Sequence, residues 1–276
     1  MGAALITGAS AGLGAEFARQ LAAKGLDLVL VARRTEKLSE VKQEIENRCP
    51  GIRISLIAGD LSQPETPRAI AEQISAQNID LHYLVNNAGA SGPRLLQDQE
   101  VGWQAHQDYL TLMMTSMTEL CHRLVPAMTA AGYGRVINVA SVAGRIASAG
   151  DSHYGPSKAY VIALSEALAL TVKPQGVHVS ALCPGFTHTD FHATAGMNEI
   201  KQSTPSMLWY SAEEVVREGI AGVEKGKAIV VSGRLYRWLD PLMQSVWTRW
   251  MFKGRGLPAS SRKKKKKSAL MRCRAD

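Results

Sequence analysis

Seven short apolar runs, with helix-like segments between most of them, constrain the fold of this sequence more than any other feature. Each run is continuously apolar instead of alternating, which is typical of strands buried on both faces of a parallel sheet. The runs lie at 3–7, 26–32, 52–60, 81–89, 134–141, 177–185 and 227–233. We therefore predict an α/β fold: a single doubly wound domain with a seven-stranded parallel sheet and helices on both faces.

Two regions interrupt this alternation. Residues 186–210 form a long insertion between a predicted strand and the next helix, and residues 234–256 hold three of the five tryptophans. Loops this long in compact domains are usually functional or mobile. We therefore expect one domain over 1–256, with 186–210 as a candidate lid, followed by a basic, disordered tail at 257–276.

The first apolar run leads directly into a glycine-rich turn, TGASAGLG, at residues 7–14. A strand, a tight glycine turn and a helix start direct backbone amides and the positive end of the helix dipole at a phosphate. Gly8, Gly12 and Gly14 let the phosphate approach the backbone closely. Because the strand and the helix are both present, we interpret the turn as the dinucleotide-binding loop of a Rossmann-type domain.

The end of the second run favours NADP(H) over NAD(H). In dinucleotide folds an acid about 20 residues beyond the turn binds the adenosine ribose of NAD, whereas a nearby arginine accommodates the 2′-phosphate of NADP. Here Ala32 stands at the acid's place and is followed by Arg33 and Arg34. A solvated surface pair is the alternative interpretation of the two arginines.

A hydroxyl, a phenol and an ammonium follow the fifth run. Ser141 ends that run, and Tyr154 and Lys158 are one helical turn apart on the same face. An ammonium ~4 Å from the phenol, at an effective dielectric of ~20, contributes about 4 kcal/mol. At about 1.36 kcal/mol per pKa unit, the pKa of the phenol falls by up to roughly three units, toward the range in which general acid/base catalysis works best.

Five motifs in this order resemble those of the short-chain dehydrogenase/reductase superfamily, in its ordinary-length branch. The resemblance covers residues 3 to about 233 and is highly specific, because each motif lies at a predicted strand end or helix start. The motifs are TGASAGLG at 7–14, NNAG at 86–89, Ser141, YGPSK at 154–158 and PGFTHT at 184–189.

The resemblance implies roles for the cofactor site. Asp60 is expected to hydrogen-bond the adenine, and Thr187 and Thr189 to hold the nicotinamide carboxamide and phosphate. Ser10 is expected to contact the phosphates. The implied cofactor-binding residues are Gly8, Ser10, Gly12, Leu13, Gly14, Arg33, Asp60, Leu61, Asn87, Ala88, Gly89, Tyr154, Lys158, Pro184, Gly185, Thr187 and Thr189.

The resemblance also implies an oxidoreductase that transfers a hydride between NADP(H) and a ketone or secondary alcohol. Tyr154 is then the general acid/base, Ser141 orients the substrate oxygen, and Lys158 holds the nicotinamide ribose. A catalytically silent, NADP-binding redox sensor of the same fold is the alternative. Apolar residues of the insertion suggest a lid over an apolar substrate or, equally, packed core: Phe186, Phe191, Met197, Met207, Leu208 and Trp209.

One residue departs from the family pattern. An asparagine, whose backbone carbonyl helps to hold a water connected to the lysine, is expected midway along the helix before Ser141. Met113 falls at its place, and no asparagine occurs between Gly89 and Arg135. A methionine side chain cannot replace the hydrogen bonds of the amide. We expect Met113 to pack, with its carbonyl or a hydroxyl such as Thr111 or Thr115 serving the proton route.

The net charge and the cysteine content limit the kinds of partner and site that we expect for this protein. The tail from 259 to 276 accounts for +7 of the net charge of +8, so a nucleic-acid-binding body is not indicated. Four scattered cysteines suggest neither a metal site nor a disulfide framework and fit the cytoplasm. The N-terminus lacks a secretory pattern, and no run approaches the roughly 18 apolar residues of a membrane span. Homo-oligomers are usual in the family.

The segment 234–256 combines aromatic and basic residues at helical spacing, interrupted by Pro241. Such a segment can lie on an anionic membrane. A dimer interface or a lid, followed by a disordered tail, is the interpretation that we favour over weak peripheral membrane contact.

Overall fold

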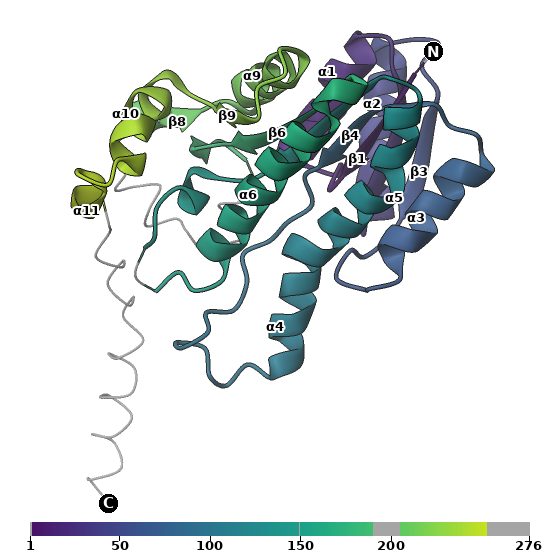
Figure 1. Cartoon of the computed structure of the whole chain (residues 1–276). Coiled ribbons are helices and arrows are strands. Elements are labelled where there is room, and N and C mark those ends of the chain that lie inside the picture. The colour runs from purple at the N-terminus through teal and green to yellow at the C-terminus, as the bar shows by residue number, and fades with distance from the viewer. Residues whose placement is uncertain (1, 149, 190–204, 253–276) are drawn as a thin grey trace, which may run out of the picture.

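The structure is a computed structural model that describes residues 2–148, 150–189 and 205–252. Its main strands are β1 (Ala3–Thr7), β2 (Asp27–Ala32), β3 (Ile54–Ala58), β4 (Leu81–Asn86), β5 (Gly134–Val139), β6 (Val177–Cys183) and β9 (Ile229–Val231). They form one parallel sheet in the order β3-β2-β1-β4-β5-β6-β9 (Figure 1). The predicted seven-stranded, doubly wound fold is therefore confirmed.

The helices alternate with the strands along most of the chain. They are α1 (Gly12–Ala23), α2 (Thr35–Arg48), α3 (Thr66–Ala76), α4 (Trp103–Leu110), α5 (Ser116–Ala130), α6 (Tyr154–Val172), α9 (Ala212–Glu224), α10 (Arg234–Gln244) and α11 (Arg249–Phe252). A π-helical turn, Thr111–Thr115, joins α4 to α5, and short 3-10 turns lie at Val142–Gly144, Lys173–Gln175 and Ser206–Leu208.

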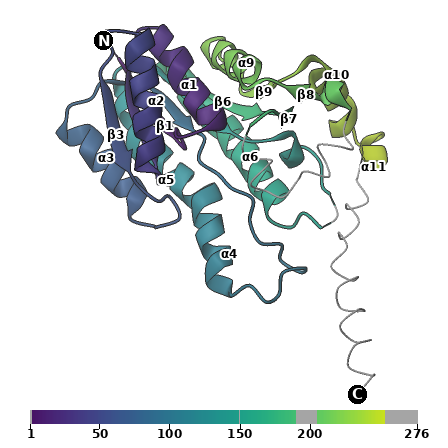
Figure 2. The same cartoon turned by 180° about the vertical axis from the view of Figure 1, so that it is seen from behind.

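Two hydrophobic layers hold the sheet between its helices. One face packs against α1, α2 and α9, and the other against α3, α5 and α6 (Figures 1 and 2). Neighbouring residues of β1 point to opposite faces, so Ile6 packs in the first layer with Phe17, while Leu5 packs in the second. All three side chains are fully buried, and each contributes about 1.5–3 kcal/mol to folding.

The sheet order reverses between β1 and β4, because the chain adds β2 and β3 on one side and β5 and β6 on the other. Ligands of doubly wound sheets bind at the carboxyl ends of the strands beside such a switch point. The ends of β1, β4, β5 and β6 carry the predicted motifs, so the fold gathers them at this edge.

The insertion after β6 contains a small element that the sequence did not reveal. Strands β7 (Phe186–Thr187) and β8 (Trp209–Tyr210) form a separate parallel pair. Residues 190–204 of the candidate lid, with Phe191 and Met197, lie outside the described residues, as does the predicted tail at 257–276.

Candidate active site

The glycine turn after β1 forms a cradle in which Gly8 and Gly14 have no room for a side chain. Gly8 and Gly12 have φ angles of 64° and 56°, in the left-handed region that favours glycine. A Cβ on Gly14 would lie 2.2 Å from the carbonyl oxygen of Gly8. The N-cap residue of α1 is Ala11, whose side chain makes no hydrogen bond to the first helical amides. These amides suit a phosphate, so the turn fits the predicted dinucleotide.

Thr7 ties the end of β4 to this turn. Its Oγ1 accepts hydrogen bonds from the backbone amides of Asn87 and Ala88, both at 3.0 Å. The Asn87 side-chain amide donates in return to the carbonyl oxygens of Thr7 at 3.0 Å and Gly8 at 3.2 Å. Thr7 was not among the predicted site residues, although it begins the glycine motif.

The two arginines at the end of β2 take different positions. Arg34 Nη2 donates to Ser10 Oγ at 3.2 Å, which brings this guanidinium to the glycine turn. Arg33 Nη1 lies 3.7 Å from Asp60 Oδ2, the predicted adenine partner. Asp60 Oδ1 is held by the backbone amide and hydroxyl of Ser62, at 3.0 and 2.9 Å. Both cations therefore lie on the side of the cradle at which the adenosine is expected.

Ser141 is held at the carboxyl edge of β5 by the turn that follows. Its Oγ accepts a hydrogen bond from the amide of Ala143 at 3.1 Å, and its side chain is largely buried. The amide of Val142 donates to the carbonyl oxygen of Pro184 at 3.0 Å. These bonds place the hydroxyl beside the segment that follows β6.

Tyr154 and Lys158 lie on the first turns of α6. The Lys158 side chain is buried, and its Nζ donates to the carbonyl oxygen of Val139 at 2.8 Å. The same Nζ is 5.7 Å from the centroid of the Tyr154 ring. Tyr154 is also hydrogen-bonded with Ser141. The fold thus brings together the three residues that the sequence singled out.

The electrostatics differ from the sequence-based expectation for the phenol. Burial raises the pKa of Tyr154 above its ordinary value, and the hydrogen bond to Ser141 offsets only part of this effect. Burial lowers the pKa of Lys158 to about 8. The expected lowering of the Tyr154 pKa is therefore wrong for this structure, because the ammonium is directed at Val139 and the phenol is desolvated. At neutral pH the phenol carries its proton and Lys158 its charge.

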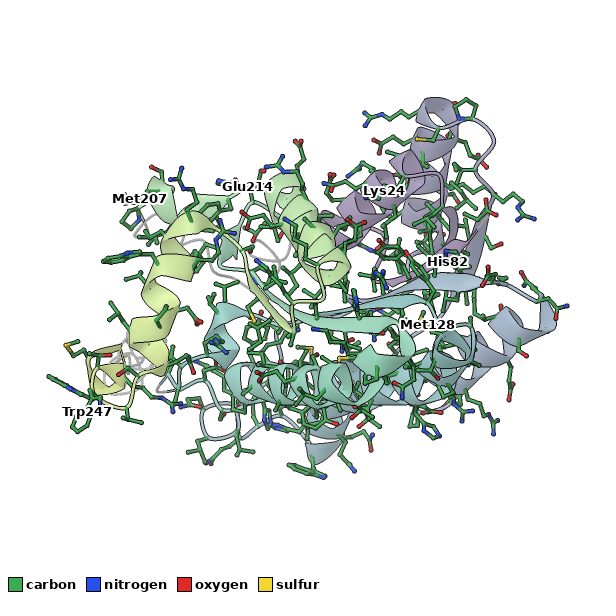
Figure 3. All side chains as sticks on the ribbon, turned by 45° about the horizontal axis from the view of Figure 1, so that its top comes forward. Lys24, His82, Met128, Met207, Glu214 and Trp247 are labelled. Atoms are coloured by element: carbon green, nitrogen blue, oxygen red, sulfur yellow. The ribbon has the colours of Figure 1, made fainter. Side chains whose placement is uncertain are left out.

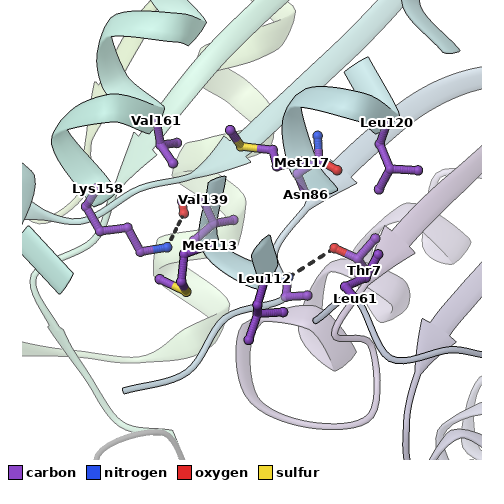
Figure 4. A pocket seen from close by; sticks show the side chains of 11 residues that line it. Thr7, Leu61, Asn86, Leu112, Met113, Met117, Leu120, Val139, Lys158 and Val161 are labelled. Atoms are coloured by element: carbon purple, nitrogen blue, oxygen red, sulfur yellow. Dashed lines mark hydrogen bonds between the residues drawn. The ribbon is translucent and has the colours of Figure 1, made fainter. Parts of the chain in front are cut away.

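Met113 lies beside the ammonium in a small internal cavity (Figure 4). It belongs to the π-helical turn, an irregularity that often marks functional sites, and its side chain is buried. A Cβ added to Gly89 would lie 3.3 Å from Met113 Sδ and 3.8 Å from Lys158 Nζ, so the three residues are in close contact. The other lining residues are Thr7, Leu61, Asn86, Ala88, Leu112, Met117, Leu120, Val139 and Val161.

The segment after β6 is fixed by Tyr236 of α10. A Cβ on Gly185 would lie 2.0 Å from the Tyr236 ring, so the ring and the glycine backbone are in contact. Tyr236 Oη accepts a bond from the Phe186 amide at 3.4 Å and donates to the Leu208 carbonyl at 3.2 Å. Thr187 is buried, and its hydroxyl donates to the carbonyl of Gly185 at 3.1 Å.

Thr189 and Leu13 both lie near the start of α1. A Cβ on Gly12 would be 3.4 Å from Thr189 Cβ, so the predicted phosphate-binding threonine faces the glycine turn. Leu13 is partly buried against the first hydrophobic layer. Leu13 therefore borders the turn through its backbone, with its side chain in the core.

An ion pair that the sequence did not suggest connects α10 to the Ser141 turn. Arg145 donates through Nε and Nη2 to both carboxylate oxygens of Asp240, at 2.7 and 2.6 Å. Gln244 Nε2 adds a bond to the Arg145 carbonyl at 2.7 Å. The two charged residues are 95 positions apart, and no local pattern relates them.

His153, the neighbour of Tyr154, contacts a histidine of α4. His153 Nε2 is 2.8 Å from Nδ1 of His106, which is buried on α4. Asp151 accepts the Gly155 amide with both oxygens, at 3.0 and 2.9 Å, and so caps the first turn of α6. His153 and Asp151 therefore support the start of α6.

The assembled groups can carry out proton transfer at a carbonyl oxygen beside a dinucleotide. A protonated phenol and a hydroxyl face the same edge as the phosphate cradle, and the buried ammonium lies behind them. Within the part of the chain that the structure describes, no cluster of three or more His, Cys, Asp or Glu side chains could hold a metal ion. Groups of this kind suit acid/base catalysis.

Comparison with known proteins agrees with this geometry. The family model described as short chain dehydrogenase matches residues 2–199. A very-long-chain 3-oxoacyl-CoA reductase of Mycosarcoma maydis is 31% identical over 73% of this chain and 56% of its own length. The chain thus spans little more than half of that relative.

Two solved structures resemble the whole fold. A short-chain dehydrogenase from Sphingobium yanoikuyae in complex with NADPH is 29% identical, with a TM-score of 0.75 over 95% of this chain and 100% of its own. The bulky-bulky ketone specific alcohol dehydrogenase from Comamonas testosteroni is 25% identical, with a TM-score of 0.71 over 96% and 98%.

Proposed function

Since this chain belongs to the short-chain dehydrogenase family of oxidoreductases, we propose that it is an NADPH-dependent reductase of apolar ketones. The convergence of Ser141, Tyr154 and Lys158 beside the glycine turn is the observation that carries the proposal. Its catalytic domain comprises residues 1–256. We further propose a cytoplasmic homo-oligomer, in keeping with the family and with the free thiols of Cys49, Cys121 and Cys183.

Each of the three residues has one role in the reaction. When bound, the cofactor supplies the hydride that reaches the carbonyl carbon. Tyr154 donates its proton to the carbonyl oxygen, and Ser141 hydrogen-bonds the same oxygen and orients it. Lys158 holds the nicotinamide ribose, and its charge stabilises the phenolate that remains after proton donation.

The protonated phenol is the form that ketone reduction requires. A phenol whose pKa is raised by burial keeps its proton at neutral pH and is therefore ready to act as a general acid. Alcohol oxidation needs the deprotonated form, which is favoured only when further positive charge lies nearby.

The cofactor is held by the cradle and distinguished by the two arginines. Gly8, Gly12 and Gly14 admit the phosphates to the backbone amides. Arg34 beside Ser10 and Arg33 beside Asp60 offer guanidiniums to the 2′-phosphate that only NADP(H) carries. The relative from Sphingobium yanoikuyae was solved with NADPH, which agrees with this preference.

The substrate is proposed to be apolar because of the side chains near the insertion. Phe186 stacks on Trp209 with ring centroids 5.2 Å apart. Leu208 packs against a third buried cluster, which includes Cys183 and Tyr236. Met207 remains 69% exposed. The Comamonas relative is named for bulky ketones and the Mycosarcoma relative for very long acyl chains, which supports the same substrate class.

A substrate screen tests this proposal. The purified protein is mixed with NADPH or NADH and a panel of aromatic, steroid-like, long-chain and sugar carbonyls, and nicotinamide absorbance is followed. We expect turnover with NADPH on apolar ketones and little on sugars. Stoichiometric NADPH binding without turnover on any carbonyl would support the redox-sensor alternative instead.

A further inference from the structure

Exposed apolar side chains concentrate on α10 and α11. Within the described chain, six of thirteen large exposed apolar residues belong to this short region. Figure 3 shows one of them, Trp247, at the outer end of the molecule. We call these six the C-terminal apolar patch: Trp238, Leu242, Val246, Trp247, Trp250 and Met251. Patches of contiguous exposed apolar residues mark interaction sites on soluble proteins.

The patch is not the core-facing side of α10. Tyr236 and Met243 face inward and are buried, whereas Trp238 and Leu242 lie one turn apart on the outer side. The helix continues through Pro241, contrary to the interruption expected from the sequence. It ends at Gln244, and the cap residue Ser245 is extended with ψ 131°.

The surroundings of the patch are positively charged. Arg234, Arg237 and Arg249 are exposed along the two helices, and Arg237 also pairs with Glu218 at 2.9 Å. The single acid between 234 and 252 is Asp240, whose carboxylate is engaged by Arg145. The sequence that follows, 253–276, adds ten basic residues against one acid.

We propose that α10 and α11 attach this protein peripherally to an anionic lipid surface. Indole rings favour the boundary between hydrocarbon and water, and arginine and lysine beside them attract anionic headgroups. A second copy of the chain is a poorer partner, because an isologous contact through this patch would bring two sets of like charges together. Among the described residues no helix has the length and apolarity needed to cross a bilayer, so the attachment is interfacial.

The attachment would place the candidate site next to the lipid. Tyr236 of α10 contacts the segment after β6, and Asp240 of the same helix binds Arg145 in the turn after Ser141. An apolar molecule dissolved in the bilayer would thus reach the edge of the site from the membrane. The proposed lipid contact itself does not depend on which reaction the site performs.

Vesicle sedimentation of the full chain tests the proposal. At low salt we expect the protein to pellet with vesicles of phosphatidylcholine and phosphatidylglycerol, and at least tenfold less with phosphatidylcholine alone. The double change Trp247→Ser and Trp250→Ser should lower partitioning at least tenfold. Trp103→Ser is the matched control, because Trp103 is 60% exposed on α4, away from the patch. Thermal melts compare the folding of the two variants with that of the unmodified protein.

A second measurement needs no variant. Brominated phospholipid in anionic vesicles should quench part of the tryptophan fluorescence of the unmodified protein, since only inserted indoles approach the bromine atoms.

Absence of binding at low salt, or of quenching, would overturn the proposal. So would binding that survives the double change but disappears on deleting 257–276, since the tail alone would then bind. If the double change instead dissociates an oligomer in the absence of vesicles, the patch contacts a second copy of the chain and the proposal is wrong.

Discussion

Replacing Lys158 by methionine should abolish reduction while leaving the fold at least as stable at neutral pH. Because burial lowers the pKa of Lys158 from 10.5 to about 8, keeping the ammonium charged inside the protein costs roughly 3 kcal/mol. The hydrogen bond from Lys158 to the Val139 carbonyl, at 2.8 Å, offsets ~1.5–3 kcal/mol of this cost. Methionine fills similar space without charge, so we expect a net gain in the free energy of unfolding of about 1 kcal/mol, obtained from these two opposing contributions.

The difference in unfolding free energy between wild type and Lys158→Met should change with pH. The folded pKa of Lys158 lies below the unfolded one, so the unfolded chain binds more protons between about pH 8 and 10.5. Wild-type stability therefore rises with pH through this window relative to the variant, by roughly 3 kcal/mol in all. Below pH 8 the difference between the two proteins should be constant.

Urea unfolding of both proteins at pH 7 and at pH 10 measures this difference. Lys227→Met, at an exposed lysine, is the control and should show no such trend. A variant more than about 2 kcal/mol less stable than wild type at pH 7 would refute the reasoning, because the interactions of the ammonium would then outweigh its burial. A stability difference that stays flat from pH 7 to pH 10 would refute it equally.

Two further predictions concern the cofactor and the departure at Met113. Arg33→Ala and Arg34→Ala should each raise the Kd for NADPH at least tenfold, since charge-assisted bonds contribute ~1.5–3 kcal/mol. Both changes should affect the Kd for NADH far less. Fluorescence titration measures both Kd values, and equal losses of affinity for the two cofactors would contradict the assignment. Met113→Ala should change kcat less than tenfold, under about 1.4 kcal/mol in the barrier, despite a stability loss of about 2–5 kcal/mol. A hundredfold loss of kcat in a folded variant would place that side chain in the reaction.

The sheet and the positions of the motifs were predictable because both follow from local sequence. Continuous apolar runs specify strands buried on both faces, and parallel strands place their carboxyl ends at one edge, so Ser141 and the glycine turn had to meet. The Tyr154–Lys158 spacing likewise fixes one helical face.

Other features depend on contacts between distant segments. Arg145 and Asp240 come together only through the packing of α10, and the β7–β8 pair needs both ends of the insertion. The pKa direction of Tyr154 was wrong because a Coulomb calculation between two charges omits the burial of the phenol. Burial depends on the whole fold and is not readable from the spacing of two residues.

Tyr154→Phe tests whether Tyr154 donates the proton to the substrate carbonyl. The phenyl ring keeps the packing of the tyrosine while removing the donor oxygen. Single-turnover reduction by bound NADPH is measured with an active ketone, beside the Kd for NADPH. We expect an unchanged Kd and a rate lowered by at least about 100-fold, the lower end of what a positioned acid contributes. A variant that retains more than a few per cent of the wild-type rate would contradict it.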